Sequence, residues 1–310
     1  MTVVIERLEP SRATPHTVGE SPLWCEREQA LYWVDIPAKQ LHRHVPGAPE
    51  AQAHRQWSFP EQVACFAFDA DGMLLAAAQT GLFAVRLGDD ETVTSAEFRE
   101  LAAPVFPASG MRFNDGRCDR QGRFWAGTMV ADMSLASDAG GLFRYDASGH
   151  LSTSLVDGLV TQNGLGFSPD GRTMYLSDSH PTRRLVWAFD YDVDSGAISE
   201  RRLFVDMNQY PGRPDGAAVD ADGCYWTCAN DGSRLLRFTP AGKLDREIVL
   251  PVSKPSMCAF GGRNFDTLFV TSILPGVNAN EHDGHVFAVR CGVQGLPEAR
   301  YAGALSAAGV

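Results

Sequence analysis

Three oxygen-bearing side chains stand at one fixed distance from a turn glycine. Asn114, Asn163 and Asp215 each lie eight residues before a glycine in a turn that also contains aspartate. A second carboxylate, Glu20, begins a comparable segment near the N-terminus. Carboxylate and amide oxygens are ligands that hard divalent cations prefer, and two carboxylates held close together repel each other unless a proton or a cation neutralises them. If the fold gathers these residues, the sequence predicts a divalent metal site.

Repeated hairpin-like segments surround these positions. Each combines an apolar stretch, a glycine-containing turn or a looser equivalent of it, and a second stretch rich in β-forming residues. The six segments are residues 20–36, 66–77, 116–128, 165–179, 217–229 and 257–272, of which the first and the last are looser copies. The turn glycines of the four middle segments recur at intervals of about 50 residues, which is typical of propeller blades built from four short strands.

Helix signals are weak along the whole chain. No long segment carries an apolar stripe with a 3.6-residue period and helix caps, and no Pro/Gly/Ser-rich linker divides the sequence. A β-sandwich would also suit an all-β chain, but six similar hairpins favour radial repetition. We therefore predict an all-β fold in which one six-bladed β-propeller, with four antiparallel strands per blade, occupies residues 1–310 as a single domain.

The propeller arrangement would bring the polar residues together. The first strand of each blade lines the central channel, so equivalent positions of successive blades form a ring around the axis. The predicted ring consists of Glu20, Ala64, Asn114, Asn163, Asp215 and Ser256. Its oxygen ligands suit calcium, magnesium or manganese, while zinc and ferrous iron stay open. Asn-Gly and Asp-Gly pairs also start hairpins without binding anything, but one offset shared by three consecutive units favours a metal site.

Charge and composition limit the partners. The formal net charge of −11 disfavours nucleic acid and anionic membranes. The longest apolar runs, such as residues 73–78, are too short to span a bilayer, and the N-terminal MTVVIERLEP lacks the apolar core of a signal peptide. Seven cysteines without a zinc-binding spacing are typical of buried thiols in a reducing compartment. We expect a cytoplasmic protein with a small-molecule partner; its oligomeric state does not follow from the sequence.

Seven short motifs, in one order, cover nearly the whole chain. They are GESPLW at 19–24, MRFNDGRCD at 111–119, FWAGTM at 124–129, NGLGFSPDG at 163–171, DYDVDSGAI at 190–198, PDGAAVDADG at 214–223 and CAFGGRNFDTLFVTS at 258–272. Through these motifs the chain resembles the SMP-30/gluconolactonase/luciferin-regenerating-enzyme family of regucalcin-like proteins. The individual motifs are short, but the ensemble is highly specific.

The resemblance implies a function and a site. Family members are six-bladed propellers that hold one divalent cation in the channel and hydrolyse sugar lactones. The resemblance places the metal on Glu20, Asn163 and Asp215. It places contacts to substrate hydroxyls on Arg112 and Asn114.

A lactone is a cyclic ester, so its hydrolysis needs a polarised carbonyl and an activated water. A metal held by three protein oxygens keeps positions open for both. We assign Asp215 as the catalytic proton acceptor and donor, and the division of labour between Asp215 and a metal-activated hydroxide stays open. A further substrate-binding acid follows the AGTM segment in the family; here it is Asp132, where the family pattern has glutamate. The expected substrate is an aldonolactone such as glucono-, galactono-, xylono- or arabinonolactone.

Two other functions stay open. A propeller with a similar metal ring could hydrolyse aryl esters or organophosphates, or it could bind calcium without being an enzyme. The sequence contains neither the G-x-S-x-G elbow of serine hydrolases nor the H-E-x-x-H helix of zinc proteases. The polar ring favours an enzyme, because a scaffold gains little from open metal positions.

Overall fold

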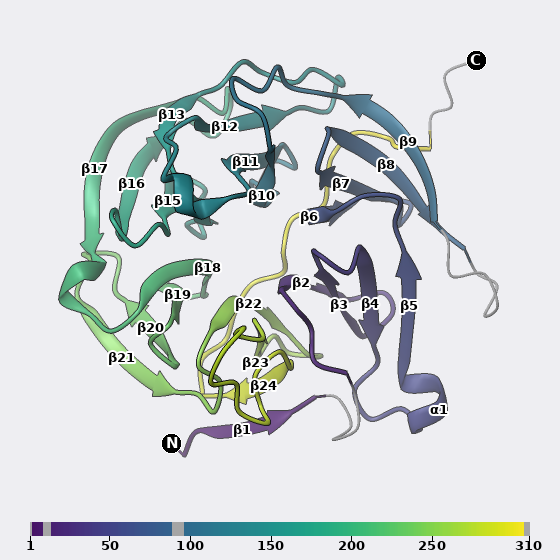
Figure 1. Ribbon diagram of the computed structural model, residues 1–310, viewed down its shortest axis with the longest axis vertical. Coiled ribbons are helices and arrows are strands. Elements are labelled where there is room, and N and C mark those ends of the chain that lie inside the picture. Colours follow the sequence, from purple (N-terminus) through teal and green to yellow (C-terminus); the bar gives the residue numbers. More distant parts are fainter. Residues whose placement is uncertain (1, 9–13, 89–95, 307–310) are drawn as a thin grey trace.

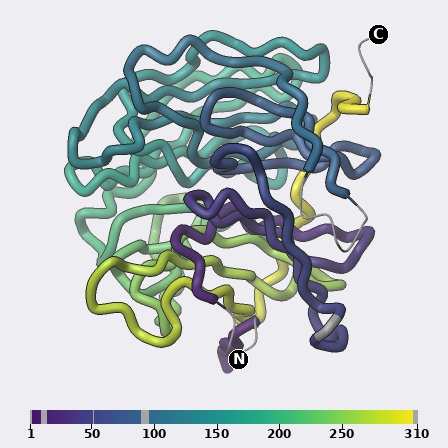
Figure 2. Tube along the Cα trace, turned by 45° about the vertical axis from the view of Figure 1, so that its right-hand side comes forward, coloured from purple at the N-terminus to yellow at the C-terminus, as the bar shows by residue number. Residues whose placement is uncertain are grey.

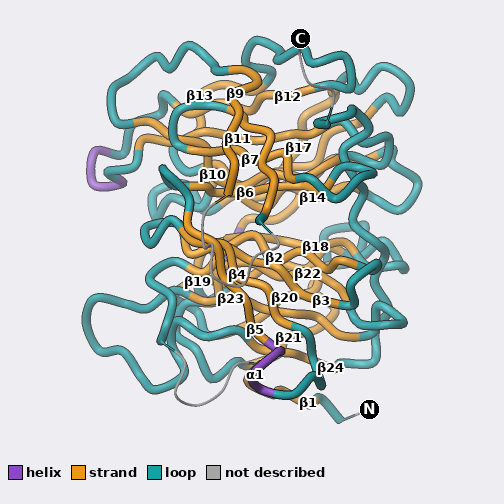
Figure 3. The backbone as a smooth tube through the Cα atoms, turned by 90° about the vertical axis from the view of Figure 1, so that its right-hand side faces the viewer, coloured by secondary structure: helices purple, strands orange, loops and turns teal. Residues whose placement is uncertain are grey.

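The computed structural model describes residues 2–8, 14–88 and 96–306, and the prediction of a six-bladed all-β propeller is confirmed. Six antiparallel sheets of four strands each form a ring (Figure 1). Seen from the side, the strands make up the middle of the molecule and the loops gather on its two faces (Figure 3). None of the helices in these ranges has the length and apolar character to cross a membrane.

Each blade is a meander whose first strand lines the channel. Blade 1 comprises β2 (Gly19–Cys25), β3 (Ala30–Asp35), β4 (Gln40–His44) and β5 (His54–Ser58). Blade 2 comprises β6 (Val63–Phe68), β7 (Leu74–Ala78), β8 (Leu82–Leu87) and β9 (Ala96–Ala102). Blade 3 comprises β10 (Met111–Cys118), β11 (Phe124–Val130), β12 (Gly140–Tyr145) and β13 (Val156–Leu159).

The second half of the ring repeats this order. Blade 4 comprises β14 (Gln162–Phe167), β15 (Thr173–Asp178), β16 (Leu185–Tyr191) and β17 (Ile198–Asp206). Blade 5 comprises β18 (Arg213–Val219), β19 (Tyr225–Asn230), β20 (Arg234–Phe238) and β21 (Leu244–Val249). Blade 6 comprises β22 (Pro255–Gly261), β23 (Thr267–Ser272), β24 (Phe287–Arg290) and β1 (Val4–Arg7). The short helices are α1 (Glu50–Ala53), η1 (Met133–Leu135) and η2 (Met207–Gln209).

The ring is closed by the N-terminal strand. β1 pairs antiparallel with β24, from Val4 opposite Arg290 to Arg7 opposite Phe287, and so becomes the outermost strand of blade 6 (Figure 1). Without β1, the sixth blade would have three strands and an unpaired outer edge. The first and the last strand of the described chain therefore pair in one sheet.

A C-terminal segment, residues 291–306, crosses the ring after β24 (Figures 1 and 2). It forms a bridge with blade 5 through Gly295 and Asp220. It then contacts blades 2 and 3, because the amide of Tyr301 donates to Phe68 O and that of Ala302 to Gly122 O. The segment thus joins blades that are far apart in the sequence, on the face where the first and second strands of each blade are connected.

The repeated Asp-and-Gly turns have one physical basis. In the turn of blade 3, Oδ1 of Asp119 accepts hydrogen bonds from the backbone N–H groups of Gln121 and Arg123, both 2.9 Å long. Gly122 has a φ of +81°, and a Cβ at this position would lie 2.6 Å from Arg300 O. Only glycine fits that turn under the C-terminal segment. Blades 2 and 5 repeat the aspartate arrangement with Asp69 and Asp220.

Apolar side chains fill the spaces between and within the blades. The largest buried residues include Trp33, Trp125 and Trp226, each with no exposed surface. They belong to separate apolar clusters of buried strand residues. Because the blades pack through these clusters, the inner strands are held as a rigid frame around the channel.

Candidate active site

Every inner strand has a β-bulge at its ring position. The pairing of each inner strand with its neighbour shifts by an extra residue at one point. The shifts lie between Glu20 and Leu23, Val63 and Cys65, Phe113 and Gly116, Asn163 and Gly166, Pro214 and Ala217, and Pro255 and Cys258. A bulge bends its strand and re-aims side chains, and bulges are common beside active sites. The predicted ring therefore coincides with a structural irregularity shared by all six blades.

The ring residues differ in where they lie relative to the bulge. Asn114 and Asp215 lie inside their bulges, whereas Glu20 and Asn163 lie just before theirs. The residue after Glu20 is Ser21 with a φ of +51°, and the residue after Asn163 is Gly164 with a φ of +60°. These two strands belong to blades 1 and 4, which lie three blades apart in the ring. A non-glycine residue such as Ser21 in the left-handed region carries backbone strain, which clusters at functional sites.

Two acids on different blades share the channel. Asp215 is 3% exposed, and burial raises its pKa to about 7. Glu20 is partly exposed by area, yet burial and the nearby charge of Asp215 raise its pKa well above the usual value. Asp115 adds its negative charge to both sites. The channel thus concentrates negative charge where water is scarce.

Among the described residues, no cation neutralises this pair at contact distance. Within residues 2–8, 14–88 and 96–306, no arginine, lysine or histidine forms an ion pair with Glu20 or Asp215. Arg213 and Arg112 lower the pKa values of Asp215 and Glu20, respectively, but only as weaker influences than burial. A buried pair of like charges is stable only when protons or an added cation neutralise it.

Asn163 adds a neutral oxygen donor beside the acids. It is 4% exposed on β14, and the neighbouring Gln162 O accepts a 2.7 Å hydrogen bond from Nδ2 of Asn114. Two carboxylates and one amide make a donor set that suits a hard divalent cation. In the described part of the chain, no group of three or more His, Cys, Asp or Glu side chains is arranged to hold a metal. An oxygen site that includes an amide is therefore the arrangement that fits these residues.

Arg112 and Asn114 form one unit on β10. Nη1 of Arg112 donates to Oδ1 of Asn114 at 2.8 Å and to Phe113 O at 2.7 Å. Burial lowers the pKa of Arg112, while the charge of Glu20 opposes that shift. The guanidinium is thus held close to the acidic pair, with further N–H groups left to donate.

Asp132 and Ser256 make hydrogen bonds that do not involve the channel acids. Asp132 is exposed on the loop after β11, and its Oδ1 accepts from Ser134 N and Ser134 Oγ at 3.0 and 2.6 Å. Ser256 is buried, and its hydroxyl donates to Gly19 O at 2.5 Å, which ties β22 to β2. Electrostatic and hydrogen-bonding contacts thus link Glu20, Asp215, Arg112 and Asn114. Asn163 follows Gln162, whose carbonyl contacts Asn114, and Asp132 is exposed on the surface.

Three polar residues lie at the ends of second strands; sequence reasoning missed Asn230 and Asp35, whereas for Asp178 in YLSDS it left open a supporting role or a surface turn. Nδ2 of Asn230 donates to Oδ2 of Asp215 at 2.6 Å and fixes that carboxylate. Asp35 accepts from the amides of residues 17 and 18 at 2.9 and 3.1 Å, just before Glu20. Asp178 accepts from residues 160 and 161 at 2.8 and 3.0 Å, just before Asn163. The shared signal is a polar residue closing the motifs YWVD, YLSD and YWTCAN.

Fold and site together define a class: a six-bladed propeller whose channel carries an acidic oxygen-donor site. The model of the SMP-30/gluconolactonase/LRE-like region matches residues 18–274, and the chain belongs to this family. A 6-deoxy-6-sulfogluconolactonase of Pseudomonas putida is 36% identical over 298 residues, which cover 93% of this chain and 96% of that protein. An L-arabinolactonase of Azospirillum brasilense is 33% identical over 298 residues, covering 94% of each.

Solved structures show the same architecture. A calcium-binding protein, regucalcin, from Agrobacterium tumefaciens superposes with a TM-score of 0.84 at 25% sequence identity. The superposition covers 95% of this chain and 96% of that chain.

Proposed function

We propose that this protein hydrolyses an aldonolactone to the open-chain aldonic acid at the acidic end of its channel. Membership of the family supports the reaction class, as do relatives that are lactonases for sulfogluconolactone and arabinolactone. The observation that carries the proposal is the pair formed by the partly exposed Glu20 and the buried Asp215, which has no ion-pairing partner within the described ranges. Such a pair is costly in a scaffold and useful in a site that binds a cation and moves protons.

Glu20, Asn163 and Asp215 would hold one divalent cation. When bound, that cation would polarise the ester carbonyl and stabilise the negative charge that develops on its oxygen. The calcium-binding relative from Agrobacterium supports a cation in this class of propeller. Calcium, magnesium, manganese, zinc and ferrous iron all remain candidates, because three oxygen donors discriminate poorly among them.

Asp215 moves the proton in the proposed reaction. The hydrogen bond from Asn230 occupies Oδ2, and we assign Oδ1 to proton transfer. Water adds its oxygen to the carbonyl carbon while one proton passes to Asp215. The bond between that carbon and the ring oxygen then breaks, and the proton moves to the departing ring oxygen, which becomes a hydroxyl of the product. A carboxylate that first takes the proton from water and then returns it to the departing oxygen suits this sequence.

Arg112 and Asn114 orient the sugar in this proposal. Their mutual hydrogen bond fixes both side chains on β10, and each keeps an N–H group that can donate to a substrate hydroxyl. Asp132, at the position where the family pattern has glutamate, would accept from a distal hydroxyl after releasing Ser134. The shorter acid gives this chain a substrate contact of its own.

The test follows acid release from a panel of aldonolactones. Chelator-stripped protein is assayed with glucono-, galactono-, xylono- and arabinonolactone, with each divalent metal added back. We expect metal-stimulated hydrolysis of at least one lactone, and its loss in Asp215→Asn. Asp157→Asn, an exposed acid on β13, is the matched control.

Other outcomes favour the alternatives. Hydrolysis of an aryl ester or of paraoxon, with no lactone turned over, would favour the esterase or organophosphatase function. Tight calcium binding without any turnover would favour a non-enzymatic calcium-binding propeller. Either result would contradict the lactonase proposal.

A further inference from the structure

An arginine crosses the channel on the far side of the acidic pair. Arg117, on β10, is 7% exposed. Its Nη2 donates to Ala217 O on β18 at 2.5 Å, and its Nη1 donates to Oε1 of Glu298 at 2.9 Å. Glu298 belongs to the C-terminal segment that crosses the ring (Figure 1). One guanidinium therefore joins blade 3, blade 5 and the end of the chain.

Asp115, two residues before Arg117, makes a parallel contact to blade 4. It is 5% exposed, and its Oδ2 accepts from the backbone N–H of Leu165 at 2.9 Å. Leu165 lies within the bulge of β14, where the ladder with β15 is interrupted. A buried N–H at such a break needs a partner from elsewhere, and Asp115 provides it.

These contacts fall at equivalent places behind two of the proposed metal ligands. Leu165 is two residues after Asn163, and Ala217 is two residues after Asp215. Both lie in or at the end of the bulge that presents the ligand. Asp115 and Arg117 thus hold the two bulges from one strand, and their own separation on β10 sets the separation of those bulges.

The two hydrogen-bond partners of Arg117 both lie outside its own blade. A small cavity borders the network, lined by Ser21, Arg117, Met257 and Glu298 among others. Glu298 is the partner that the channel strands do not supply, so the C-terminal segment decides where the guanidinium rests.

We propose that Asp115, Arg117 and Glu298 form a positioning network that sets the geometry of Asn163 and Asp215 for cation binding. This inference rests on the proposed metal site. None of the three touches substrate in the proposed reaction; they act through the two bulges. Residues that orient metal ligands typically change affinity or activity by about 10- to 100-fold when they are altered.

The test measures Mn²⁺ affinity of the chelator-stripped, full-length protein by calorimetry. We expect Glu298→Ala to raise the Kd for Mn²⁺ by about 10- to 100-fold, and Glu298→Gln, which keeps an acceptor for Arg117, to fall between this variant and the wild type. Ser306→Ala is the matched control, because Ser306 anchors the same segment to Asp71 on the exposed rim. With an aldonolactone, Glu298→Ala should lower kcat more than it changes KM, since Arg112 and Asn114 are untouched.

A second variant decides the matter if Glu298→Ala does not fold. Arg117→Lys keeps a positive charge beside Asp115 but lacks the fork that reaches Ala217 O and Glu298 together. We expect the same rise in Kd, and wild-type affinity in this variant would overturn the network. If the wild-type protein binds Mn²⁺ but hydrolyses no lactone, the proposed function is wrong while the metal site stands. The Mn²⁺ affinities of the variants then still test the network. A wild type that binds no divalent cation would overturn both the metal site and the network.

Discussion

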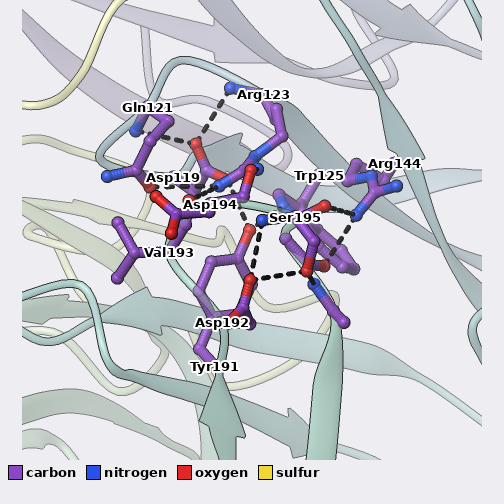
Figure 4. A network of polar contacts seen from close by, with 12 residues as sticks. Asp119, Gln121, Arg123, Trp125, Arg144, Tyr191, Asp192, Val193, Asp194 and Ser195 are labelled. Carbon is purple, nitrogen blue, oxygen red and sulfur yellow. Dashed lines mark hydrogen bonds and ion pairs between the residues drawn. The ribbon is translucent and has the colours of Figure 1, made fainter.

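Two groups of buried acids in this molecule have opposite surroundings. In the channel, Glu20 and Asp215 have no ion pair with any described residue, and burial raises both pKa values. Between blades 3 and 4, Asp119 has no exposed surface, and both of its oxygens accept hydrogen bonds (Figure 4). Oδ1 accepts two backbone N–H groups, and Oδ2 accepts from Arg123 Nε at 2.5 Å and from the hydroxyl of Tyr191.

The surroundings of Asp119 show what a structural acid looks like in this fold. Arg123 continues from Asp119 to Val193 O and Asp194 O at 2.7 and 3.0 Å, and Arg144 donates to Ser195 O and Gly196 O at 3.0 and 2.6 Å (Figure 4). The turn within DYDVDSGAI is thereby pinned to blade 3. Burial alone does not mark a functional acid; burial without a cationic partner among the described residues does.

The largest expected effect is the loss of activity when the channel acid Asp215 is replaced. Asp215→Asn removes the proposed proton carrier and one charged ligand, so we expect kcat for an aldonolactone to fall by about 10²- to 10⁴-fold. The free energy of unfolding of the metal-free protein should not fall, because the variant relieves repulsion with Glu20. Steady-state kinetics and denaturant unfolding check both statements; a variant with wild-type kcat would show that Asp215 is not the catalytic acid.

The mirror experiment removes the structural acid. Asp119→Ala takes the carboxylate from Arg123 and Tyr191, and breaking a buried pair in this way costs about 3 kcal/mol of unfolding free energy. Mn²⁺ affinity should stay at the wild-type value, because the turn lies on the opposite face from the site. If Asp119→Ala lowered Mn²⁺ affinity without lowering the free energy of unfolding, Asp119 would not be a purely structural acid.

The metal-free protein should reveal the channel acids through pH. Glu20 and Asp215 have raised pKa values in the folded state, so the folded state binds more protons than the unfolded state. For Asp215, whose pKa is raised to about 7, this window runs from about pH 4 to 7. Their contribution to stability is therefore present at low pH and is lost as the pH rises through this window. Denaturant unfolding at pH 5 and 7.5 measures the loss, and saturating Ca²⁺ or Mn²⁺ should reduce it. If neither added cation reduces this loss of stability, the result contradicts the proposed metal site.

The smallest expected effect concerns substrate contact at the rim. Asp132→Ala removes one proposed hydrogen bond to the sugar, so we expect a roughly fivefold rise in KM. The melting temperature should hardly change, because Asp132 is exposed and caps only the short helix η1. Asp132→Glu, which restores the residue of the family pattern, should alter the preference among aldonolactones. Unchanged KM values across the panel in both variants would remove Asp132 from the site.

Much of the candidate site could be predicted because its residues occupy equivalent positions in repeated hairpins. Asn114, Asn163 and Asp215 share one offset from a turn glycine, and the repeat of short strands identifies the channel strands that carry them. The eight-residue offset does not distinguish the two kinds of bulge, because the residue type of Ser21 does not reveal its left-handed backbone conformation. Asn230 was also missed, since its contact with Asp215 joins two strands whose pairing register only the folded sheet shows.

By itself, the sequence determined the features that depend on local patterning: the period of the hairpins, the Asp-and-Gly turns and the residue types available at the ring. Tertiary structure decided which of those residues lack a partner, how β1 completes blade 6, and how Glu298 reaches Arg117 across 181 positions of chain. The physical reason is that turns and strands follow from neighbouring residues, whereas the neutralisation of a buried charge depends on every segment that the fold brings to it.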